Sequence, residues 1–590
     1  MNFEKNINTL VSFIIESKKI KAKNNINQTI NRHFRKIDFI VKAAIILDVI
    51  ILNLFSLFFY QRFFNNLTNI EIKKIIKKSS FFFNFLTIKS LEALHALICI
   101  HVFNDEKIEV KKVKAIQKNF YEFIVIGSGP GGSITANKLN KNFPDKTLLI
   151  DKGQEFNTPK TKHSGEEFYY KWASGGVASS LYPYQINFSS GSCIGGGSEI
   201  NSGLYHEPDS DFLNKWIEKY ETKNLQFEHL KEFIDEINTY LKPSVSSQNS
   251  LFEKNFKLGA DLTKKKFQNI PRLSYKDKTH SVESTMLNTY LKDYKENGGD
   301  ILSGLNIVKI LQVKDGWHIE GYLDQEKKYL KCKYLFLCCG SIYTNSLLLN
   351  SLKFKNKKSI KKFNFHPMIK IIAKYPNKIQ NINEDVSALQ ITSHHPEFII
   401  GNAASSKQFM LASVFENKEI YDDILNNWEY MSIYHATFSF GNGSIFKLPI
   451  LKKDLFFYHI KESNLHLILR SLKEMCNFVF KSGASEIILI STKEKKKVSL
   501  KNFNEVISSF KKLKDFIFSS VHILGGVTMG EKKGCITDSY GKVKEYDNLY
   551  VNDSSLINNK LLKNPQGAVM AVACRNIENF IRNYKNFEKV

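Results

Sequence analysis

The sequence predicts an α/β protein (α+β overall) with a Rossmann-like domain, an antiparallel-sheet domain and an N-terminal helical extension. Three observations support this: a strand–glycine loop–helix–strand unit within residues 121–153, alternating strand-like and helix-like stretches in residues 366–515, and an apolar run over residues 39–60. At 590 residues the chain is too long for one hydrophobic core, so several domains are expected.

The glycine loop follows an apolar run, residues 123–126, and reads Gly127-x-Gly129-x-x-Gly132. The first glycine permits a tight turn, the second lets the backbone approach a pyrophosphate, and the third allows close helix–strand packing. A helix that starts here would direct its free N–H groups and positive dipole end at the phosphates.

A second apolar run, residues 147–150, ends at Asp151, where a carboxylate can accept hydrogen bonds from ribose hydroxyls. A glycine-rich turn without a ligand is the alternative. Because strand, turn, helix, strand and acid follow one another in order, the sequence favours a dinucleotide site over that alternative.

Composition limits the other function classes. The formal charge of +26 comes from Lys residues spread along the whole chain, and no nucleic-acid-binding motif accompanies them. We therefore expect no nucleic-acid partner, although a basic chain can be attracted to anionic lipids or substrates. Eight Cys without metal-type spacing predict reduced thiols and no metal site.

The apolar run Phe39–Tyr60 is long enough to cross a bilayer as a helix. Asp48 near its middle would cost roughly 3 kcal/mol on insertion scales, which the apolar residues can offset. A single membrane span and a helix buried in an N-terminal helical domain both remain open, so the expected location is cytoplasmic or membrane-associated. A cleavable signal peptide is not expected, because the run starts too late.

Two further segments indicate a cofactor site. Three consecutive glycines, 195–197, precede Ser198 and imply backbone pressed against a flat or phosphorylated group. Near the C-terminus, His522 is followed by a strand that ends at Asp553 and by Asn564-Pro565, which opens a helix. This block is expected to return to the edge of the sheet that carries the glycine loop.

Together these segments resemble the glucose–methanol–choline (GMC) family of FAD-dependent oxidoreductases over roughly residues 118–590. The resemblance also includes the strand–helix transition at Gly340 and the motif Asn364-x-His366-Pro367. The C-terminal block is most similar to the cholesterol oxidase and long-chain fatty alcohol oxidase branches. The second of these branches also carries an apolar helical N-terminal extension.

The resemblance implies noncovalent FAD, because no His of the type that carries covalent flavin in some relatives is found near Gly191. It implies pyrophosphate contacts from the glycine loop, ribose contacts from Asp151 and ribityl–pyrophosphate contacts from Asp553. The implied FAD-binding residues are Gly127, Gly129, Gly132, Asp151, Gly196, Ser198, Asn201, Asp553 and Pro565.

The resemblance also implies catalytic roles for His522 and Asn564. A neutral imidazole, whose usual pKa is roughly 6.5, can accept the hydroxyl proton of an alcohol while the α-hydrogen leaves as hydride. Asn564 cannot titrate, but its amide can hold the hydroxyl oxygen in place. A loop histidine without a catalytic role is the alternative for His522; His366, His394, His395 and His435 are expected to be structural or substrate-domain residues.

Some positions depart from the family pattern. Ile523 and Asn558 stand where many relatives have Pro, and Gly197 replaces a Ser. No counterpart of the catalytic carboxylate of cholesterol oxidase is assigned, which argues against steroid isomerisation.

The expected organisation has six segments. They are an N-terminal helical extension (1–116), FAD-binding parts (117–209, 286–365 and 516–590) and substrate-domain parts (210–285 and 366–515).

The expected activity is oxidation of a lipophilic small-molecule alcohol to an aldehyde or ketone, with oxygen, a quinone or a redox protein as electron acceptor. Two other functions use the same fold: light-driven decarboxylation of fatty acids, and a noncatalytic flavin-binding membrane component. Retention of both His522 and Asn564 favours alcohol oxidation over either.

Overall fold

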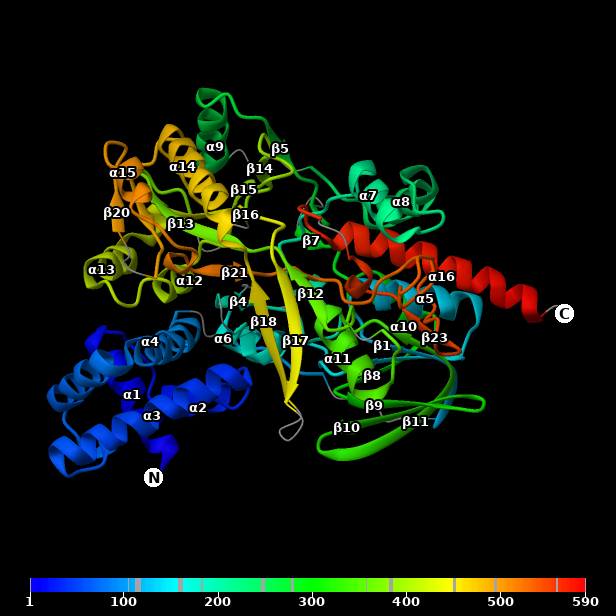
Figure 1. Cartoon of the computed structure of the whole chain (residues 1–590), viewed down its shortest axis with the longest axis horizontal. Helices are drawn as coiled ribbons and strands as arrows, with labels where there is room; N and C mark the ends of the chain where they lie inside the picture. Colours follow the sequence, from blue (N-terminus) through cyan, green and yellow to red (C-terminus); the bar gives the residue numbers. More distant parts are fainter. Residues whose placement is uncertain are drawn as a thin grey trace.

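The computed structural model describes residues 2–588 except 104–105, 112–117, 157–162, 182–183, 246–249, 277–280, 357, 381–385, 449–452, 493–495 and 559–560. Figure 1 shows the N-terminal helices at one end of the molecule, the nucleotide-binding sheet with its helices at the other, and an antiparallel sheet with its helices beside them. The expected domain boundary at residues 116–117 lies outside the described residues.

The nucleotide-binding sheet contains the predicted strand–loop–helix–strand unit. Its parallel strands lie in the order β8 (Asp300–Ser303), β2 (Thr147–Asp151), β1 (Phe120–Ile126), β11 (Glu326–Leu337) and β23 (Leu549–Val551). β10 (Gly316–Leu323) and β9 (Asn306–Val313) extend it as an antiparallel meander. The Rossmann-like α/β fold is therefore confirmed.

Helices cover this sheet because its central strands are apolar on both faces, as parallel strands usually are. Phe123, Ile124 and Val125 are fully buried. The covering helices that pack on one another are α5 (Pro130–Asn142), α10 (Tyr290–Glu296), α16 (Gln566–Glu588) and α8 (Phe227–Leu241). α11 (Ser341–Ser351) packs against β9, and α7 (Ser210–Tyr220) precedes α8.

The segment Ser284–Tyr294 has helical spacing, yet the helix begins only at Tyr290. The Met286 N–H donates to Ser198 Oγ (3.0 Å), and the Leu287 N–H donates to Glu199 Oε1 (3.2 Å). These backbone groups are used by a tertiary contact, which spacing along the sequence does not reveal.

The second sheet is antiparallel along most of its length, as expected for the substrate side. Its main path runs β3 (Ala178–Ser179), β4 (Ile186–Phe188), β21 (Phe518–Ser520), β13 (Met368–Lys374), β16 (Met431–Thr437), β15 (Ile399–Asn402), β14 (Leu389–Ile391) and β5 (Phe267–Asn269). β19 (Glu486–Leu489) pairs with β13 and β20 (Lys496–Val498). β21 and β4 pair in parallel.

Helices α9 (Leu251–Leu262), α14 (Leu465–Lys481) and α15 (Phe503–Ser508) contribute to the hydrophobic core on one side of the second sheet. α12 (Lys407–Ala412) and α13 (Lys418–Asn427) lie between this domain and the N-terminal helices. Two smaller sheets complete the fold: β18 (Lys453–His459), β17 (Asn442–Leu448), β12 (Lys362–Phe365) and β22 (Ile523–Leu524), and the pair β6 (Ser274–Lys276) and β7 (Ser281–Glu283).

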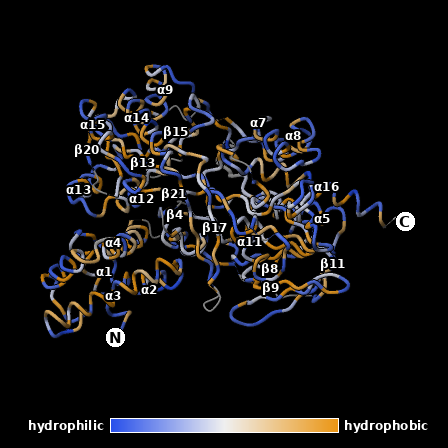
Figure 2. The backbone as a smooth tube through the Cα atoms, viewed as in Figure 1, coloured by the Kyte–Doolittle hydropathy of each residue, from blue (hydrophilic) through white to orange (hydrophobic). Residues whose placement is uncertain are grey.

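The N-terminal region is helical, as expected. It comprises α1 (Phe3–Ser17), α2 (Ile26–Phe34), α3 (Phe39–Tyr60) and α4 (Asn69–Val102), and α4 is kinked at Phe83. Figure 2 shows hydrophobic segments along these helices. By length and composition, α3 is the one described helix that could cross a membrane.

Contacts of α2 and α4 join the N-terminal helices to the rest of the protein. His33 of α2 contacts His101 of α4 (Nδ1 to Nε2, 2.7 Å) and the carbonyl of Gly175 (2.8 Å). Phe168, from α6 (Gly165–Lys171), and Trp172 belong to the hydrophobic cluster of the N-terminal helices. The helical region therefore shares its core with a segment that follows the glycine loop in sequence.

Candidate functional site

One cavity of about 1440 Å³ joins the nucleotide-binding sheet to the antiparallel sheet. Its lining includes most of the predicted site residues: Gly127, Gly129, Asp151, Gly196, Asn201, His522, Asp553, Asn564 and Pro565. The two catalytic candidates and the glycine loop are far apart in sequence, and the fold brings them to a single cavity.

Three helix N-termini lie at this cavity. α5 starts at Pro130 after Gly129, α11 starts at Ser341 after Gly340, and α16 starts at Gln566 after Pro565. Each presents the positive end of a helix dipole to the cavity. This arrangement suits a ligand with a diphosphate.

The glycines test whether a dinucleotide fits. A Cβ on Gly129 or Gly197 would meet no protein atom within 4 Å, so these residues border open space of the cavity. A Cβ on Gly132 would lie 1.8 Å from the Gly127 carbonyl oxygen, as expected for the glycine of close helix–strand packing. Gly132 does not line the cavity, whereas its neighbour Gly131 does. The residues fit an extended dinucleotide such as FAD.

Asp151 fastens the glycine loop to the second strand. Its Oδ2 accepts from the Ser128 N–H (2.8 Å) and hydroxyl (2.6 Å), and Oδ1 accepts from the Gly153 N–H (2.7 Å). The Gly195 N–H donates to the Ser128 hydroxyl (3.0 Å). Burial raises the pKa of Asp151, and these hydrogen bonds oppose that rise. Ser128 thus links both glycine segments; its place between two motif glycines is the sequence signal for this role.

Asp553 performs a similar task beside the glycine loop, where its Cα would lie 3.2 Å from a Cβ on Gly131. One carboxylate oxygen accepts from the Gly340 N–H (2.8 Å) and the Thr344 hydroxyl (2.5 Å), and the other accepts from the Ser555 N–H (2.8 Å). Asp553 therefore ties the end of β23 to the N-terminus of α11 and presents a buried carboxylate to the cavity.

The residues of the 195–201 segment separate into two groups. The Asn201 amide donates to Gln566 Oε1 (2.6 Å), which holds it beside α16 and the cavity. Ser198 is not among the cavity-lining residues. Its hydroxyl donates to the Gly195 carbonyl (2.9 Å) and accepts from the Met286 N–H. In this structure Ser198 shapes the loop without reaching the cavity.

His522 is held by a second imidazole. His366 Nδ1 lies 3.0 Å from His522 Nδ1, and the Leu561 carbonyl is a second partner of His366. A carbonyl only accepts, so Nε2 of His366 carries the hydrogen and its Nδ1 is the acceptor. His522 must then donate from Nδ1, and its Nε2 is left with a free lone pair. The sequence motif pointed to His366, but its contact with His522 was missed.

The electrostatic environment keeps His522 neutral. Burial lowers its pKa from 6.5 to about 4. The surrounding imidazoles are neutral for the same reason. Burial lowers the pKa of His206 and His435 to about 3, and it lowers the pKa of His366 well below 6.5. His522 can therefore act as a base throughout the neutral range.

Asn564 is oriented by His206. Its side chain forms a hydrogen bond that favours protonated His206, so the amide oxygen is the acceptor. His206 Nδ1 has no partner among the described residues, which leaves Nε2–H as the donor. The Asn564 NH₂ group donates to no described residue, so it can donate to a ligand in the cavity. His206 carried no motif that would have identified it.

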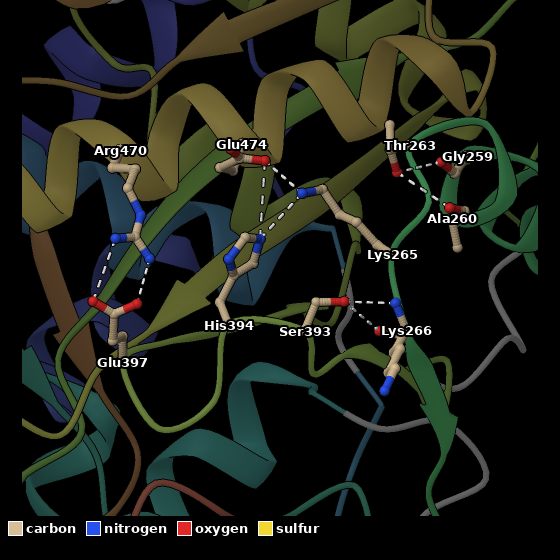
Figure 3. Close-up of polar contacts among 10 residues, drawn as sticks. All are labelled: Gly259, Ala260, Thr263, Lys265, Lys266, Ser393, His394, Glu397, Arg470 and Glu474. Carbon is tan, nitrogen blue, oxygen red and sulfur yellow. Dashed lines mark hydrogen bonds and ion pairs between the residues drawn. The ribbon is translucent and has the colours of Figure 1, made fainter.

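His394 lies away from the cavity. Its Nε2 accepts from Lys265 Nζ (3.1 Å) and is 3.9 Å from Glu474, which itself pairs with Lys265 (Figure 3). Arg470 and Glu397 form a neighbouring ion pair. These contacts connect α14 to the loop before β15 and give His394 a structural role.

Replacing Gly129 with Val is expected to weaken FAD binding by about 10- to 100-fold, because overpacking typically costs 1–3 kcal/mol. The Cβ of the new side chain would meet no protein atom within 4 Å, so the fold should survive. Titration of the apoprotein with FAD measures the loss, and circular dichroism monitors folding. Unchanged FAD affinity in a folded variant would show that the loop does not hold the cofactor.

Comparison with known proteins agrees with this geometry. Two family models described as GMC oxidoreductase match the chain, one over residues 168–368 and one over residues 456–573, together more than half of it. A GMC-type oxidoreductase, y4nJ, of Sinorhizobium fredii is 23% identical over 479 residues, which cover 77% of this chain and 93% of the relative.

Two more proteins are similar. The long-chain-alcohol oxidase FAO4A of Arabidopsis thaliana is 21% identical and covers 76% of this chain and 67% of its own length. The crystal structure of pyridoxine 4-oxidase from Mesorbium loti superposes with a TM-score of 0.58 at 14% identity, covering 79% of this chain and 99% of that one. Family models, fold and cavity agree: this chain belongs to the GMC family of FAD-binding oxidoreductases that act on CH–OH groups.

Proposed function

We propose that the protein oxidises a lipophilic alcohol to an aldehyde or ketone, with His522 as base and Asn564 as positioning partner. The observation that carries the proposal is one cavity that contains both a dinucleotide cradle and an oriented, neutral imidazole. Anaerobic bleaching of the bound flavin by an alcohol tests it.

The residues divide the reaction between them. His522 Nε2 accepts the hydroxyl proton, because its Nδ1–H is engaged by His366. The Asn564 NH₂ donates to the hydroxyl oxygen and fixes the direction of the carbon–hydrogen bond. FAD, when bound, supplies the acceptor for the hydride.

The lipophilic substrate is supported by the wall of the cavity beside the N-terminal helices. Phe168, Trp172 and Phe409 line the cavity and also pack against the hydrophobic cluster of those helices. An apolar alcohol could lie along this wall, since burial of apolar surface contributes roughly 25 cal/mol per Å².

Noncovalent FAD and its acceptor are parts of the same proposal. We expect acid precipitation of the purified protein to release the flavin into the supernatant; colour retained in the pellet would indicate a covalent bond. Oxygen, a quinone or a redox protein can each be tested as acceptor by following reoxidation of the reduced protein.

The rate of flavin reduction should show an acidic limb near pH 4 rather than near pH 6.5. The reaction needs neutral His522, and burial lowers its pKa to about 4, so activity is retained down to about pH 5 and lost as the pH falls through 4. Anaerobic reduction rates measured from pH 4 to 8 provide the check. A reduction rate that falls to half near pH 6.5 would contradict the role of a buried His522 as the base.

The N-terminal helices are proposed to contact a membrane surface rather than to span it. Asp48 in α3 is buried, and its Oδ1 accepts from the Thr87 hydroxyl of α4 (2.7 Å), so this carboxylate faces the helical cluster and not the surface of the molecule. Three phenylalanines are largely exposed where the end of α3 lies beside the kink of α4. Phe58, Phe81 and Phe82 are 80%, 82% and 68% exposed, respectively. Exposed lysines lie on α4 in the turns before Phe81: Lys73, Lys74, Lys77 and Lys78. Aromatic side chains with adjacent cations suit an anionic lipid surface.

Replacing Phe58, Phe81 and Phe82 together with Ser should reduce binding to phosphatidylserine-containing vesicles at least about tenfold, because burying one such ring contributes roughly 1.5–3 kcal/mol. Phe587→Ser is the matched control, since this ring is 89% exposed at the opposite end of the molecule. Cosedimentation measures binding. Equal binding of the triple variant and the control would contradict contact through this patch.

A further inference from the structure

A row of side chains crosses the antiparallel sheet on the face that lines the cavity. Gln390 of β14 is in register with Gly401 of β15, Gly401 with His435 of β16, and His435 with Lys370 of β13. Residues in register on neighbouring strands share one face of the sheet. Gln390, His435 and Lys370 all line the cavity.

Gly401 makes this row possible. A Cβ at this position would lie 3.1 Å from His435 Nε2 and 3.6 Å from Gln390 Cγ. The missing side chain leaves room for the His435 ring, whose Nδ1 is 2.8 Å from the Thr437 hydroxyl. The imidazole is therefore fixed beside Lys370.

Lys370 has no counter-ion in the part of the chain that the structure describes: no carboxylate there lies within 4.0 Å of its Nζ. Burial lowers the pKa of this ammonium group, and no nearby acid opposes the shift. The titratable groups that face it are imidazoles kept neutral by burial, His435 and beyond it His522. An enclosed cation without a partner is costly, which is typical of a group that binds an anion.

Two amide oxygens also lack partners among the described residues: one belongs to Gln390 of the row and one to Asn402, which follows Gly401 on β15. Gln390 is 6% exposed and Asn402 is 7% exposed, and both line the cavity. Their side-chain oxygens accept no hydrogen bond from any described residue. Buried polar atoms are normally satisfied. Turning a side-chain amide by 180° exchanges its oxygen for its NH₂ group, so each of these amides can present a hydrogen-bond donor to an anionic ligand group in the cavity.

We propose that the alcohol substrate carries a carboxylate, bound by Lys370 with Gln390 and Asn402. This inference rests on the proposed function and narrows its substrate to hydroxy acids with an apolar remainder. His435 interacts electrostatically with both Lys370 and His522, so the carboxylate lies near the reacting hydroxyl and not at the far end of a long chain. Phe168, Trp172 and Phe409 remain available for the apolar part.

The test uses the FAD-loaded, full-length protein and compares each hydroxy acid with its methyl ester. The probes are 2-, 3- and 10-hydroxydecanoate, their esters and 1-decanol, with anaerobic bleaching as readout. Wild-type protein should be half-saturated at about 10- to 100-fold lower concentrations of 2- or 3-hydroxydecanoate than of the esters, as expected for a charge-assisted hydrogen bond. Lys370→Met should abolish the preference, and Lys370→Arg should retain part of it.

A second readout does not depend on turnover. Decanoate, which has no hydroxyl group, should perturb the absorption spectrum of the bound flavin in wild type and not in Lys370→Met, while decanamide should have little effect in either. Bleaching by 1-decanol with no preference for hydroxy acids would overturn this inference and leave alcohol oxidation standing. Bleaching by none of the probes, without decanoate binding, would contradict both. Weaker FAD binding by Lys370→Met, with the carboxylate preference intact once the variant is saturated with added FAD, would overturn the inference and show that the ammonium serves the cofactor.

Discussion

Replacing His522 with Ala is expected to slow flavin reduction by an alcohol about 10²- to 10⁴-fold, the usual contribution of a positioned base. The variant should remain yellow, because the FAD cradle is formed by other residues: the 127–131 loop, Asp151 and Asp553. Rapid-mixing measurements under anaerobic conditions give the rate constant, and the flavin spectrum gives the cofactor content.

His394→Gln is the matched control for a histidine substitution. This residue belongs to the substrate domain but lies in the network of Lys265 and Glu474, away from the cavity. The bound flavin of the His394→Gln variant should be reduced as fast as that of wild type. A His522→Ala variant that is reduced as fast as this control would remove His522 from the mechanism.

Replacing His366 with Leu is expected to lower the rate of flavin reduction about 10- to 100-fold. The alcohol concentration that gives half of the maximal rate should change less. The substitution removes the acceptor of the His522 Nδ1–H, and a buried donor without a partner costs about 1–3 kcal/mol. The imidazole can then place its hydrogen on Nε2, where it no longer accepts a proton.

His366→Gln separates orientation from simple destabilisation. A glutamine can accept from His522 through its carbonyl and donate to the Leu561 carbonyl through its amide, so it should restore a large part of the rate. Equal losses in the Leu and Gln variants, accompanied by equal losses in thermal stability, would show that His366 is structural only.

The sequence predicted the parts of the site that depend on local chain geometry. The glycine loop and Asp151 are readable because the strand, turn and helix that position them are contiguous. His522 and Asn564 were recognised through ordered motifs, and the fold brings both to the cavity. Ser128 lies inside the motif and follows from the same geometry.

The residues that orient His522 and Asn564, the proposed catalytic pair, could not be found in this way. His206 and His366 reach Asn564 and His522 from segments far apart in the chain, and only the packing of β12, β22 and the segment before α16 brings them together. The row from Gln390 to Lys370 depends on strand register across four strands, to which no sequence motif corresponds. For Ser198 the motif predicted a cofactor contact that the structure does not show. Its hydroxyl instead forms hydrogen bonds with the Gly195 carbonyl and the Met286 N–H.

The most direct test of the account is anaerobic bleaching of the bound flavin in wild type and His522→Ala, against a panel of alcohols and hydroxy acids. The account predicts that at least one lipophilic alcohol or hydroxy acid bleaches the wild-type flavin, that air or a quinone restores the colour, and that the yellow His522→Ala protein is reduced at least about 100-fold more slowly. A wild-type flavin that stays oxidised with every compound, or equal bleaching of both proteins, would contradict it.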